Sequence, residues 1–533
     1  MSQGQLCLVL HAHLPYVRHP EYDSFFEENW LFEAMTECYI PLLGVLNRLQ
    51  HERVRYRLTL SLSPTLITMW RDELLQQRYL RYLHNLIELS EKEIQRTRHD
   101  RNYQALARLY RRYYQHTLTL YREQYECDLL NAFLSHQKMG QLELLTTAAT
   151  HGFLPLLSAS ETAVRNQIDV GIDTFNQHVG FVPKGFWLPE CGYYPGLERF
   201  LNDAGIEYFF TDSHSFTYAR TPAQDGVYAP LRCPNGVVAF ARDPESSRQV
   251  WSAQEGYPGD EDYREYYSDI GFELELDYLA PYLLADKTRV NTGIKYRRIT
   301  GHECAKELYA PRKAYAKAVL HSADFIKQRQ QQCERLGSET ARPPLIVAPY
   351  DAELFGHWWF EGPIWLEHVL RNAAKPDSSI STVTPSDYLT QHSDLQTSIP
   401  SASTWGEHGY FSYWINDSND WIYPHLYQAS AKMEKFVLEL QGLSLTNLQE
   451  RALNQAVRSI LLAQASDWPF IMKSGTTKDY ATKRVTDHLA RFNYLYENVR
   501  SGRINERYLT ALEIMDNIFP TLDFRDYCSL ASD

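Results

Sequence analysis

Two carboxylates follow apolar, strand-like runs, each where a buried strand would give way to a loop. Glu190 follows the run Lys184-Gly-Phe-Trp-Leu-Pro189, and Asp351 ends the run Leu345-Ile-Val-Ala-Pro-Tyr350. In α/β barrels the carboxyl ends of the strands carry the catalytic groups. Two carboxylates on neighbouring strand ends, surrounded by aromatic residues, form the arrangement that glycoside hydrolysis and transfer require. The structural alternatives are that Glu190 accepts hydrogen bonds from loop amides and that Asp351 caps the N-terminus of a helix.

Three histidines also fall at predicted strand ends. They are His11, His13 and His151, and Asp212 ends a fourth strand. A His-x-His pair with a distant carboxylate is one way to bind a metal ion, as in barrel-like deacetylases. Neutral histidines that donate hydrogen bonds to sugar hydroxyls explain the same residues. The residue types alone leave both interpretations open.

Tryptophans lie in glycine-rich segments downstream. Trp405 and Trp414 flank glycine turns, where exposed indole rings are suited to stacking on sugars. Asp467-Trp468-Pro469 follows a helical pattern, which predicts that a late helix returns to the cleft. Packing between domains explains Trp468 equally well.

The elements that must position these residues alternate between strands and helices. Between six and eight runs resemble buried parallel strands, and Trp30–Leu46 resembles a helix. Residues 68–135 contain no Pro or Gly and predict long amphipathic helices inserted into the barrel. Residues 217–259 are rich in Pro, Gly, Ser and Asp and predict a long loop with short β-like pieces. After Pro400 the patterns become helical. We therefore predict an α/β barrel at 1–67 and 136–400, a helical insertion at 68–135 and a C-terminal helical domain at 401–533 that contributes to the cleft.

Composition limits the possible partners. The chain has 533 residues, 44% of them hydrophobic, and a net charge of −13. That charge, spread along the chain, argues against nucleic-acid binding. No apolar run reaches the ~20 residues that span a bilayer, and Met1–Gln5 lacks a basic leader, so we expect no membrane association and a cytoplasmic location. The cysteines are scattered without a C-x-x-C pair, which predicts free thiols, and they are Cys7, Cys38, Cys127, Cys191, Cys233, Cys304, Cys333 and Cys528.

Five ordered motifs resemble glycoside hydrolase family 57, and within it the 1,4-α-glucan branching enzymes. They are His11-Ala-His-Leu-Pro15, Ala149-Thr-His-Gly-Phe153, Trp187-Leu-Pro-Glu-Cys-Gly-Tyr193, Ala348-Pro-Tyr-Asp-Ala-Glu-Leu-Phe-Gly-His-Trp-Trp359 and Ala465-Ser-Asp-Trp468. The resemblance implies an incomplete (β/α)7 barrel. It also implies that Glu190 is the nucleophile, that Asp351 is the general acid/base, and that neither a metal nor an organic cofactor is needed.

The resemblance further implies a set of substrate-binding residues. They are His11, His13, His151, Trp187, Arg264, His357, Trp405, Trp414, Asp467 and Trp468. Branching enzymes of this family cover the cleft with a mobile loop that has an aromatic tip. The segment Gly226–Gly236 is its expected equivalent, with Tyr228 as its aromatic residue.

The expected substrate is an α-glucan polymer and the expected state is a monomer. A family 57 α-amylase or 4-α-glucanotransferase is the nearest alternative, because the same site serves water or another acceptor. A metal-dependent carbohydrate deacetylase and a glucan-binding protein without activity are the more distant ones.

Overall fold

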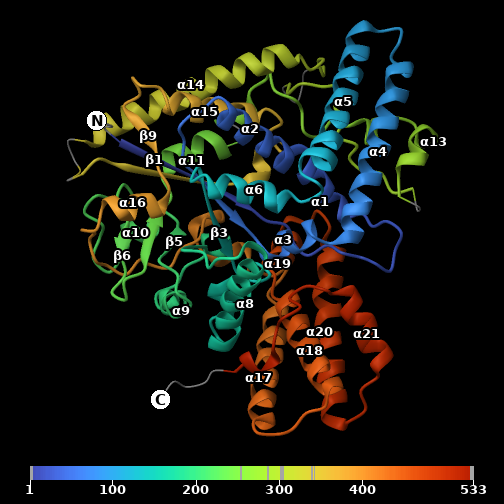
Figure 1. The fold of residues 1–533 in the computed structure, drawn as a ribbon, viewed down its shortest axis with the longest axis vertical. Helices are drawn as coiled ribbons and strands as arrows, with labels where there is room; N and C mark the ends of the chain where they lie inside the picture. Colours follow the sequence, from blue (N-terminus) through green and yellow to red (C-terminus); the bar gives the residue numbers. More distant parts are fainter. Residues whose placement is uncertain are drawn as a thin grey trace.

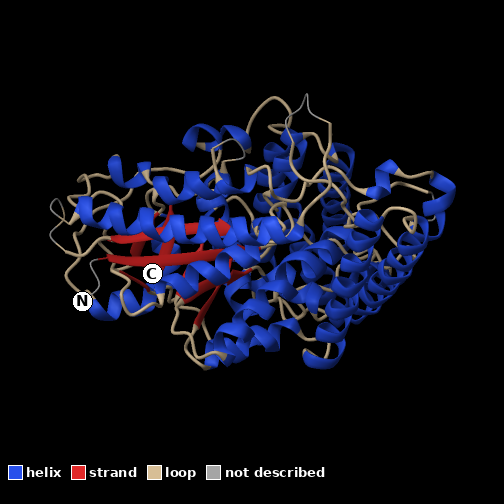
Figure 2. Ribbon diagram, turned by 90° about the horizontal axis from the view of Figure 1, so that it is seen from above, coloured by secondary structure: helices blue, strands red, loops and turns tan. Residues whose placement is uncertain are grey.

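The structure, a computed structural model, describes residues 4–252, 255–284, 287–300, 305–337, 340 and 342–528. Cys304, one of the expected free thiols, lies outside these residues; the other seven cysteines form no disulfide. A central sheet carries two projecting groups of helices, the α4–α5 pair and the C-terminal bundle (Figure 1). Helices cover both sides of the strands (Figure 2).

Nine strands form the sheet in the described part of the chain. They are β1 (Gly4–Ala12), β2 (Leu58–Leu62), β3 (Leu142–Thr147), β4 (Gly185–Trp187), β5 (Tyr208–Thr211), β6 (Leu231–Arg232), β7 (Val238–Ala241), β8 (Leu345–Asp351) and β9 (Ile380–Thr382). Pairing is parallel along the order β7-β5-β4-β3-β2-β1-β8; β6 is antiparallel to β7, and β9 pairs with the start of β1.

The sheet curls without closing. The Asp243 amide donates to the Val347 carbonyl at 2.8 Å, so the end of β7 approaches β8. Within the described residues no strand ladder joins these two strands. Seven parallel strands curled in this way form the incomplete (β/α)7 barrel that the sequence predicted.

Buried apolar runs form the strands and bring polar residues to one edge. Strand β1 is buried along almost its whole length, as expected for a parallel strand covered on both faces. In the register, His11 of β1 lies opposite Ser61 of β2 and Asp351 of β8. The carboxyl ends of these strands therefore gather the predicted site residues.

Helices connect and cover the strands. Before the insertion these are α1 (Glu28–Ala34), a π-helical turn (Met35–Tyr39), α2 (Ile40–His51) and α3 (Pro64–Trp70). Those between β3 and β8 are α7 (Leu154–Leu157), α8 (Glu161–Val179), α9 (Leu197–Asp203), α10 (His214–Thr217), α11 (Pro244–Trp251), α12 (Ile270–Glu273), α13 (Leu276–Leu279) and α14 (Pro311–Leu336). After β8 come α15 (Gly362–Ala373) and α16 (Pro385–Gln391).

The predicted helical stretch after α3 forms a projecting pair. It consists of α4 (Glu73–Arg96) and α5 (Arg101–Thr119), followed by a π-helical turn and α6 (Leu129–Lys138). Asp72 and Asp100 cap the first two helices by accepting hydrogen bonds from backbone amides. Tyr79, Tyr110 and Tyr114 are buried here, so part of the aromatic excess is structural rather than sugar-binding.

The C-terminal region is a helical bundle, as expected. It contains α17 (Ile422–Leu440), α18 (Asn447–Ala463), α19 (Asp467–Ser474), α20 (Lys478–Ser501) and α21 (Glu506–Met515). Figure 1 shows α19 where the bundle meets the sheet. None of the helices among the described residues is long and apolar enough to cross a membrane.

The predicted loop at 217–259 is largely ordered structure, with residues 253–254 outside the described part. It contains β6, β7 and α11, and β7 is one of the seven parallel strands. The expectation of a lid at Gly226–Gly236 is therefore wrong. The Tyr228 carbonyl accepts from the amide of Leu345, the first residue of β8. Asp351 ends the same strand six residues later, about 20 Å away along an extended strand.

Candidate active site

Glu190 lies in a tight turn directly after β4. The turn spans Pro189–Cys191, and Glu190 has φ 58° and ψ 25°. Such a left-handed conformation is unfavourable for a residue other than Gly, Asn or Asp and recurs at functional sites. The Glu190 carbonyl is fixed from the C-terminal side, because Thr404 Oγ1 donates to it at 2.7 Å and the Trp405 amide at 3.2 Å. The surrounding chain therefore enforces the strained turn.

The Glu190 carboxylate has a hydrogen-bond donor on each oxygen. Trp405 Nε1 donates to Oε2 at 2.9 Å, and Ser466 Oγ donates to Oε1 at 3.2 Å. Burial raises the pKa of Glu190 to about 7, while these two donors lower it. The negative charge of Asp467 raises this pKa and the positive charge of His13 lowers it.

Asp351 ends β8 in a different environment. Among the described residues no donor forms a hydrogen bond with its carboxyl group. Burial raises the pKa of Asp351 well above its usual value, and the charges of Glu353 and Glu190 raise it further. Asp351 thus keeps its proton while Glu190 ionises more readily.

The sheet order corrects one expectation about this pair. Glu190 and Asp351 do not lie on neighbouring strands, because β3, β2 and β1 separate β4 from β8. They meet across the curl of the sheet, close enough for the charge of Glu190 to raise the pKa of Asp351. A pair of carboxyl groups with different proton affinities can supply a nucleophile and an acid.

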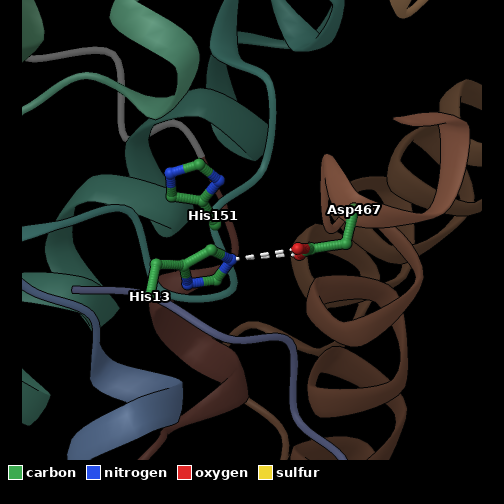
Figure 3. Close-up of side chains that lie close together, drawn as sticks. All are labelled: His13, His151 and Asp467. Atoms are coloured by element: carbon green, nitrogen blue, oxygen red, sulfur yellow. Dashed lines mark hydrogen bonds and ion pairs between the residues drawn. The ribbon is translucent and has the colours of Figure 1, made fainter. Parts of the chain in front are cut away.

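The three predicted histidines form one stacked cluster. His13 stacks on His151 with ring centroids 4.0 Å apart, and His11 stacks on Trp187 at 4.7 Å. His13 Nε2 lies 3.1 Å from Asp467 Oδ2. Figure 3 shows Asp467 directed towards His13 from a separate helix, with His151 beside them. The first residue of α19 thus reaches the barrel, as the Asp-Trp-Pro pattern predicted.

Within the described residues, the same cluster is the candidate metal site. His13, His151 and Asp467 offer atoms within 4.8 Å of one another. Both ring nitrogens of His151 are already engaged, Nε2 with His11 at 3.0 Å and Nδ1 with Ser466 at 2.8 Å. His13 Nε2 is engaged with Asp467. This donor set fits a hydrogen-bonded network better than a metal site, in which neutral imidazoles leave a lone pair free for the ion.

Trp405 lies against the Glu190 carboxylate, whereas Trp187 lies behind Trp405. Trp187 is completely buried and packs edge-on against Trp405, with centroids 5.0 Å apart. Trp251, a residue that the motifs did not identify, is 37% exposed and lies 5.9 Å from Trp405 between centroids. As placed, Trp187 orients its neighbours and offers no open face to a sugar.

Two further predicted tryptophans are core residues in this structure. Trp414 is 1% exposed and stacks on Phe153 with centroids 4.6 Å apart. Trp468 is also buried, and its Nε1 donates to the Leu462 carbonyl at 2.8 Å. Packing explains both positions without a bound sugar.

Arg264 and His357 belong to a network built on Glu37. Arg264 Nη2 donates to Glu37 Oε1 at 3.0 Å, and His357 Nδ1 donates to Oε2 at 2.8 Å. These partners hold the pKa of Glu37 below its usual value although burial raises it. Arg264 is buried and His357 is partly exposed. The network therefore fixes the loop after β8 and leaves only His357 near solvent.

Close backbone contact holds that loop against the π-helical turn. Gly356 has φ 114°, and a Cβ atom there would lie 1.7 Å from the Glu37 carbonyl oxygen. Two residues that the sequence did not single out complete this region. Glu353 Oε1 accepts from the His13 amide at 3.2 Å and from the Tyr39 hydroxyl. The proximity of Glu353 to Asp351 in the motif was the available signal; nothing marked Tyr39.

Comparison with known proteins places this site in a family. The profile of glycosyl hydrolase family 57 matches residues 7–400, and that of the 1,4-alpha-glucan branching enzyme C-terminal region matches residues 425–527. The chain therefore belongs to glycosyl hydrolase family 57, in the form that carries a branching-enzyme C-terminal region.

Individual relatives agree over the whole chain. A 1,4-alpha-glucan branching enzyme of Thermococcus kodakarensis is 33% identical, over 99% of this chain and 79% of that protein. The crystal structure of a family 57 branching enzyme from Pyrococcus horikoshii has a TM-score of 0.89 at 33% identity, covering 99% and 97% of the two chains. The structure described as the α-amylase AmyC from Thermotoga maritima has a TM-score of 0.93 at 42% identity, covering 99% of both. Structures described as a branching enzyme and as an α-amylase thus share this fold.

Proposed function

We propose that this enzyme is a retaining α-glucan transglycosylase that forms α-1,6 branches. It cleaves an α-1,4 linkage and transfers the released segment to a 6-hydroxyl group. The observation that carries this proposal is the junction at Glu190. The barrel supplies the carboxylate, and the region that matches branching enzymes, residues 425–527, contains Ser466 and Asp467, which lie around it.

In the first step Glu190 attacks C1 of the donor glucose. Asp351 gives its proton to the departing glycosidic oxygen, and a covalent glycosyl-enzyme forms. A retaining mechanism of this kind requires carboxyl groups about 5–5.5 Å apart. The buried, protonated Asp351 and the hydrogen-bonded Glu190 suit these two roles.

In the second step Asp351 takes the proton of an incoming hydroxyl group. The oxygen of that group attacks C1 and displaces Glu190, so that configuration is retained overall. A glucose 6-hydroxyl gives a branch, a 4-hydroxyl gives disproportionation and water gives hydrolysis. Trp405, which is partly exposed beside Glu190, is the residue best placed to hold a sugar ring and exclude water.

The similarity to an α-amylase supports a second candidate, hydrolysis at the same site. Proton NMR of amylose incubated with the enzyme separates the two. We expect a rise in the α-1,6 anomeric signal that exceeds the rise in reducing ends. Reducing ends without new α-1,6 signal would establish a hydrolase, and altered chain lengths without either would establish a 4-α-glucanotransferase.

The control variant is Glu190→Gln, which keeps the size of the side chain and loses the nucleophile. We expect it to abolish both signals, whereas a glucan-binding protein without activity would be unaffected. A chelator during the same assay tests the metal-dependent alternative. Full activity after chelation is expected, because both ring nitrogens of His151 and the Nε2 of His13 are engaged in hydrogen bonds.

The remaining assignments extend this proposal. His13, His357, Trp405 and Asp467 are the expected sugar contacts because each is partly exposed at the site. The end of the family 57 profile at residue 400 supports the proposed boundary at 400/401. Helices α4 to α6 support the proposed helical insertion at 68–135. The seven described cysteines are free thiols, which supports a cytoplasmic location. We further propose that the enzyme is a monomer and needs no cofactor. Light scattering of the purified enzyme tests the monomer directly.

A further inference from the structure

Ser466 joins the C-terminal domain to the catalytic carboxylate. Its amide donates to the His151 carbonyl at 3.0 Å, so its backbone is fixed to the barrel. Its hydroxyl group lies 2.8 Å from His151 Nδ1 and 3.2 Å from Glu190 Oε1. A hydroxyl group has one proton, so it can donate to only one of these two atoms.

The hydrogen bonds continue beyond His151 into the barrel. His151 Nε2 lies 3.0 Å from His11 Nε2, and His11 Nδ1 lies 3.1 Å from Ser61 Oγ. Burial lowers the pKa of both histidines well below the usual value, and the interaction with His13 lowers it further. Both rings are therefore neutral, and each carries one ring proton.

Neutral rings leave one direction for the chain when Glu190 is ionised. A carboxylate only accepts, so the Ser466 hydroxyl donates to Glu190 and must accept from His151 Nδ1–H. His151 Nε2 is then bare and accepts from His11 Nε2–H. His11 Nδ1 is in turn bare and accepts from the Ser61 hydroxyl group. Reversing any one link would place two lone pairs or two protons against each other.

We propose that Ser466 is a positioning residue that links the nucleophile to this one-way chain of hydrogen bonds. The chain runs from Ser61 through His11, His151 and Ser466 to Glu190, and it holds the ionised carboxylate in position for attack. All four ring nitrogens of His11 and His151 form hydrogen bonds of this chain. They therefore serve the nucleophile rather than bind sugar hydroxyls, which leaves His13 as the histidine of the cluster that faces the substrate.

Kinetics of variants test the role of Ser466. Ser466→Ala is expected to lower kcat for donor cleavage roughly tenfold to hundredfold, the effect of losing one hydrogen bond to a charged group. The Ser466 hydroxyl group lowers the pKa of Glu190, so its removal should raise that pKa. The acid limb of the pH profile should therefore move to higher pH. Asp467, His13, His151 and Asp351 also face Glu190, and none of them is changed in this variant. Ser466→Thr, which keeps the hydroxyl group, should restore the profile.

Ser61 gives a distant test, because it lies three hydrogen bonds from Ser466. Ser61→Ala should shift the acid limb in the same direction by a smaller amount. Thr59→Val is the matched control, since it removes a buried hydroxyl group from the same face of β2 outside the chain. An unshifted limb in both Ser466→Ala and Ser61→Ala would overturn the proposal.

Nitrogen-15 NMR of histidine-labelled enzyme tests the direction without any activity. We expect the proton of His151 on Nδ1 and that of His11 on Nε2 above pH 8, assigned with His11→Gln and His151→Gln. The reverse tautomers would overturn the proposal even if the variants lost activity. The proposal builds on Glu190 as the nucleophile of the proposed function. It can fail independently, because cleavage of the donor is measured whether water or a glucan accepts the product.

Discussion

Glu190 and Asp351 share one buried site but differ in the hydrogen-bond donors around them. Burial raises the pKa of both, whereas only Glu190 has donors, Trp405 and Ser466, that oppose the shift. This contrast supports the proposal that Glu190 is the ionised nucleophile and Asp351 the proton donor. The sequence motifs predicted both residues, because each follows a buried strand. Ser466 lies in one of these motifs, but its role could not be predicted, because its contact with Glu190 spans 276 positions of the chain.

Trp405→Phe tests the donor on the other carboxylate oxygen. Loss of the indole N–H removes an interaction that lowers the pKa of Glu190. The acid limb of kcat/KM should therefore move to higher pH, with a loss of activity of roughly tenfold or more. Trp251→Phe serves as a control, because that ring adjoins Trp405 and, in the described part of the chain, forms no hydrogen bond with the Glu190 carboxylate. An acid limb at the same pH in Trp405→Phe as in the wild type would contradict the assignment of Glu190 as the ionised nucleophile.

Asp351→Asn should make the protein more stable at high pH. Unfolded Asp351 loses its proton near pH 4, while the folded residue keeps it to a much higher pH. Between these values the native state holds the extra proton, so stability falls as pH rises. The melting temperature of the variant should exceed that of the wild type by roughly 1–3 °C at pH 8 and equal it near pH 3. A variant that melts lower at both values would contradict the pKa shift.

At the scale of elements, close approach of the loop after β8 to the π-helical turn positions Asp351 and His357. The strands that carry the motifs were predictable because continuous apolar runs mark buried parallel strands. Strand β7 was predicted only as a short β-like piece of a loop, because its four residues lie within a segment rich in Gly, Pro and Asp. The error at Tyr228 has the same origin. The segment expected to form the lid instead leads into a strand, and Tyr228 lies beside Leu345 at the start of β8, whereas Asp351 ends β8.

Gly356→Ala tests the contact between these elements. The new methyl group would overlap the Glu37 carbonyl oxygen, so the loop must shift, and both stability and kcat should fall. A destabilisation of about 2–4 kcal/mol is expected for such a clash at positive φ. Gly236→Ala is the matched control, since Gly236 has φ 99° and nothing within 4 Å of the added atom. Equal effects of the two substitutions would show that backbone strain alone is responsible.

At the scale of the whole molecule, the barrel and the C-terminal bundle build the site together. The barrel supplies both carboxyl groups, and the segment entering α19 supplies Ser466 and Asp467. The sequence predicted that this helix returns to the cleft, because Asp-Trp-Pro ends a helical pattern. It could not separate the partly exposed Asp467 from the buried Trp468, since burial depends on packing against distant helices.

Asp467→Asn tests this contribution of the bundle. The charge of Asp467 raises the pKa of Glu190, so its removal should shift the acid limb to lower pH, opposite to Trp405→Phe. Activity should still fall, by roughly tenfold, because His13 loses its charged partner. The pH profile of donor cleavage measures both effects. A shift to higher pH would show that Asp467 acts only through the fold.

The most direct test of the account is to identify the residue that carries the covalent intermediate. An Asp351→Ala variant is incubated with α-maltosyl fluoride, whose fluoride leaves without a proton from the enzyme, and the digested protein is analysed by mass spectrometry. Because the base needed for the second step is missing, we expect a maltosyl group to accumulate on the peptide that contains Glu190. A label on another carboxylate, such as Glu353, or turnover that persists in Glu190→Gln, would contradict the assignment of the nucleophile.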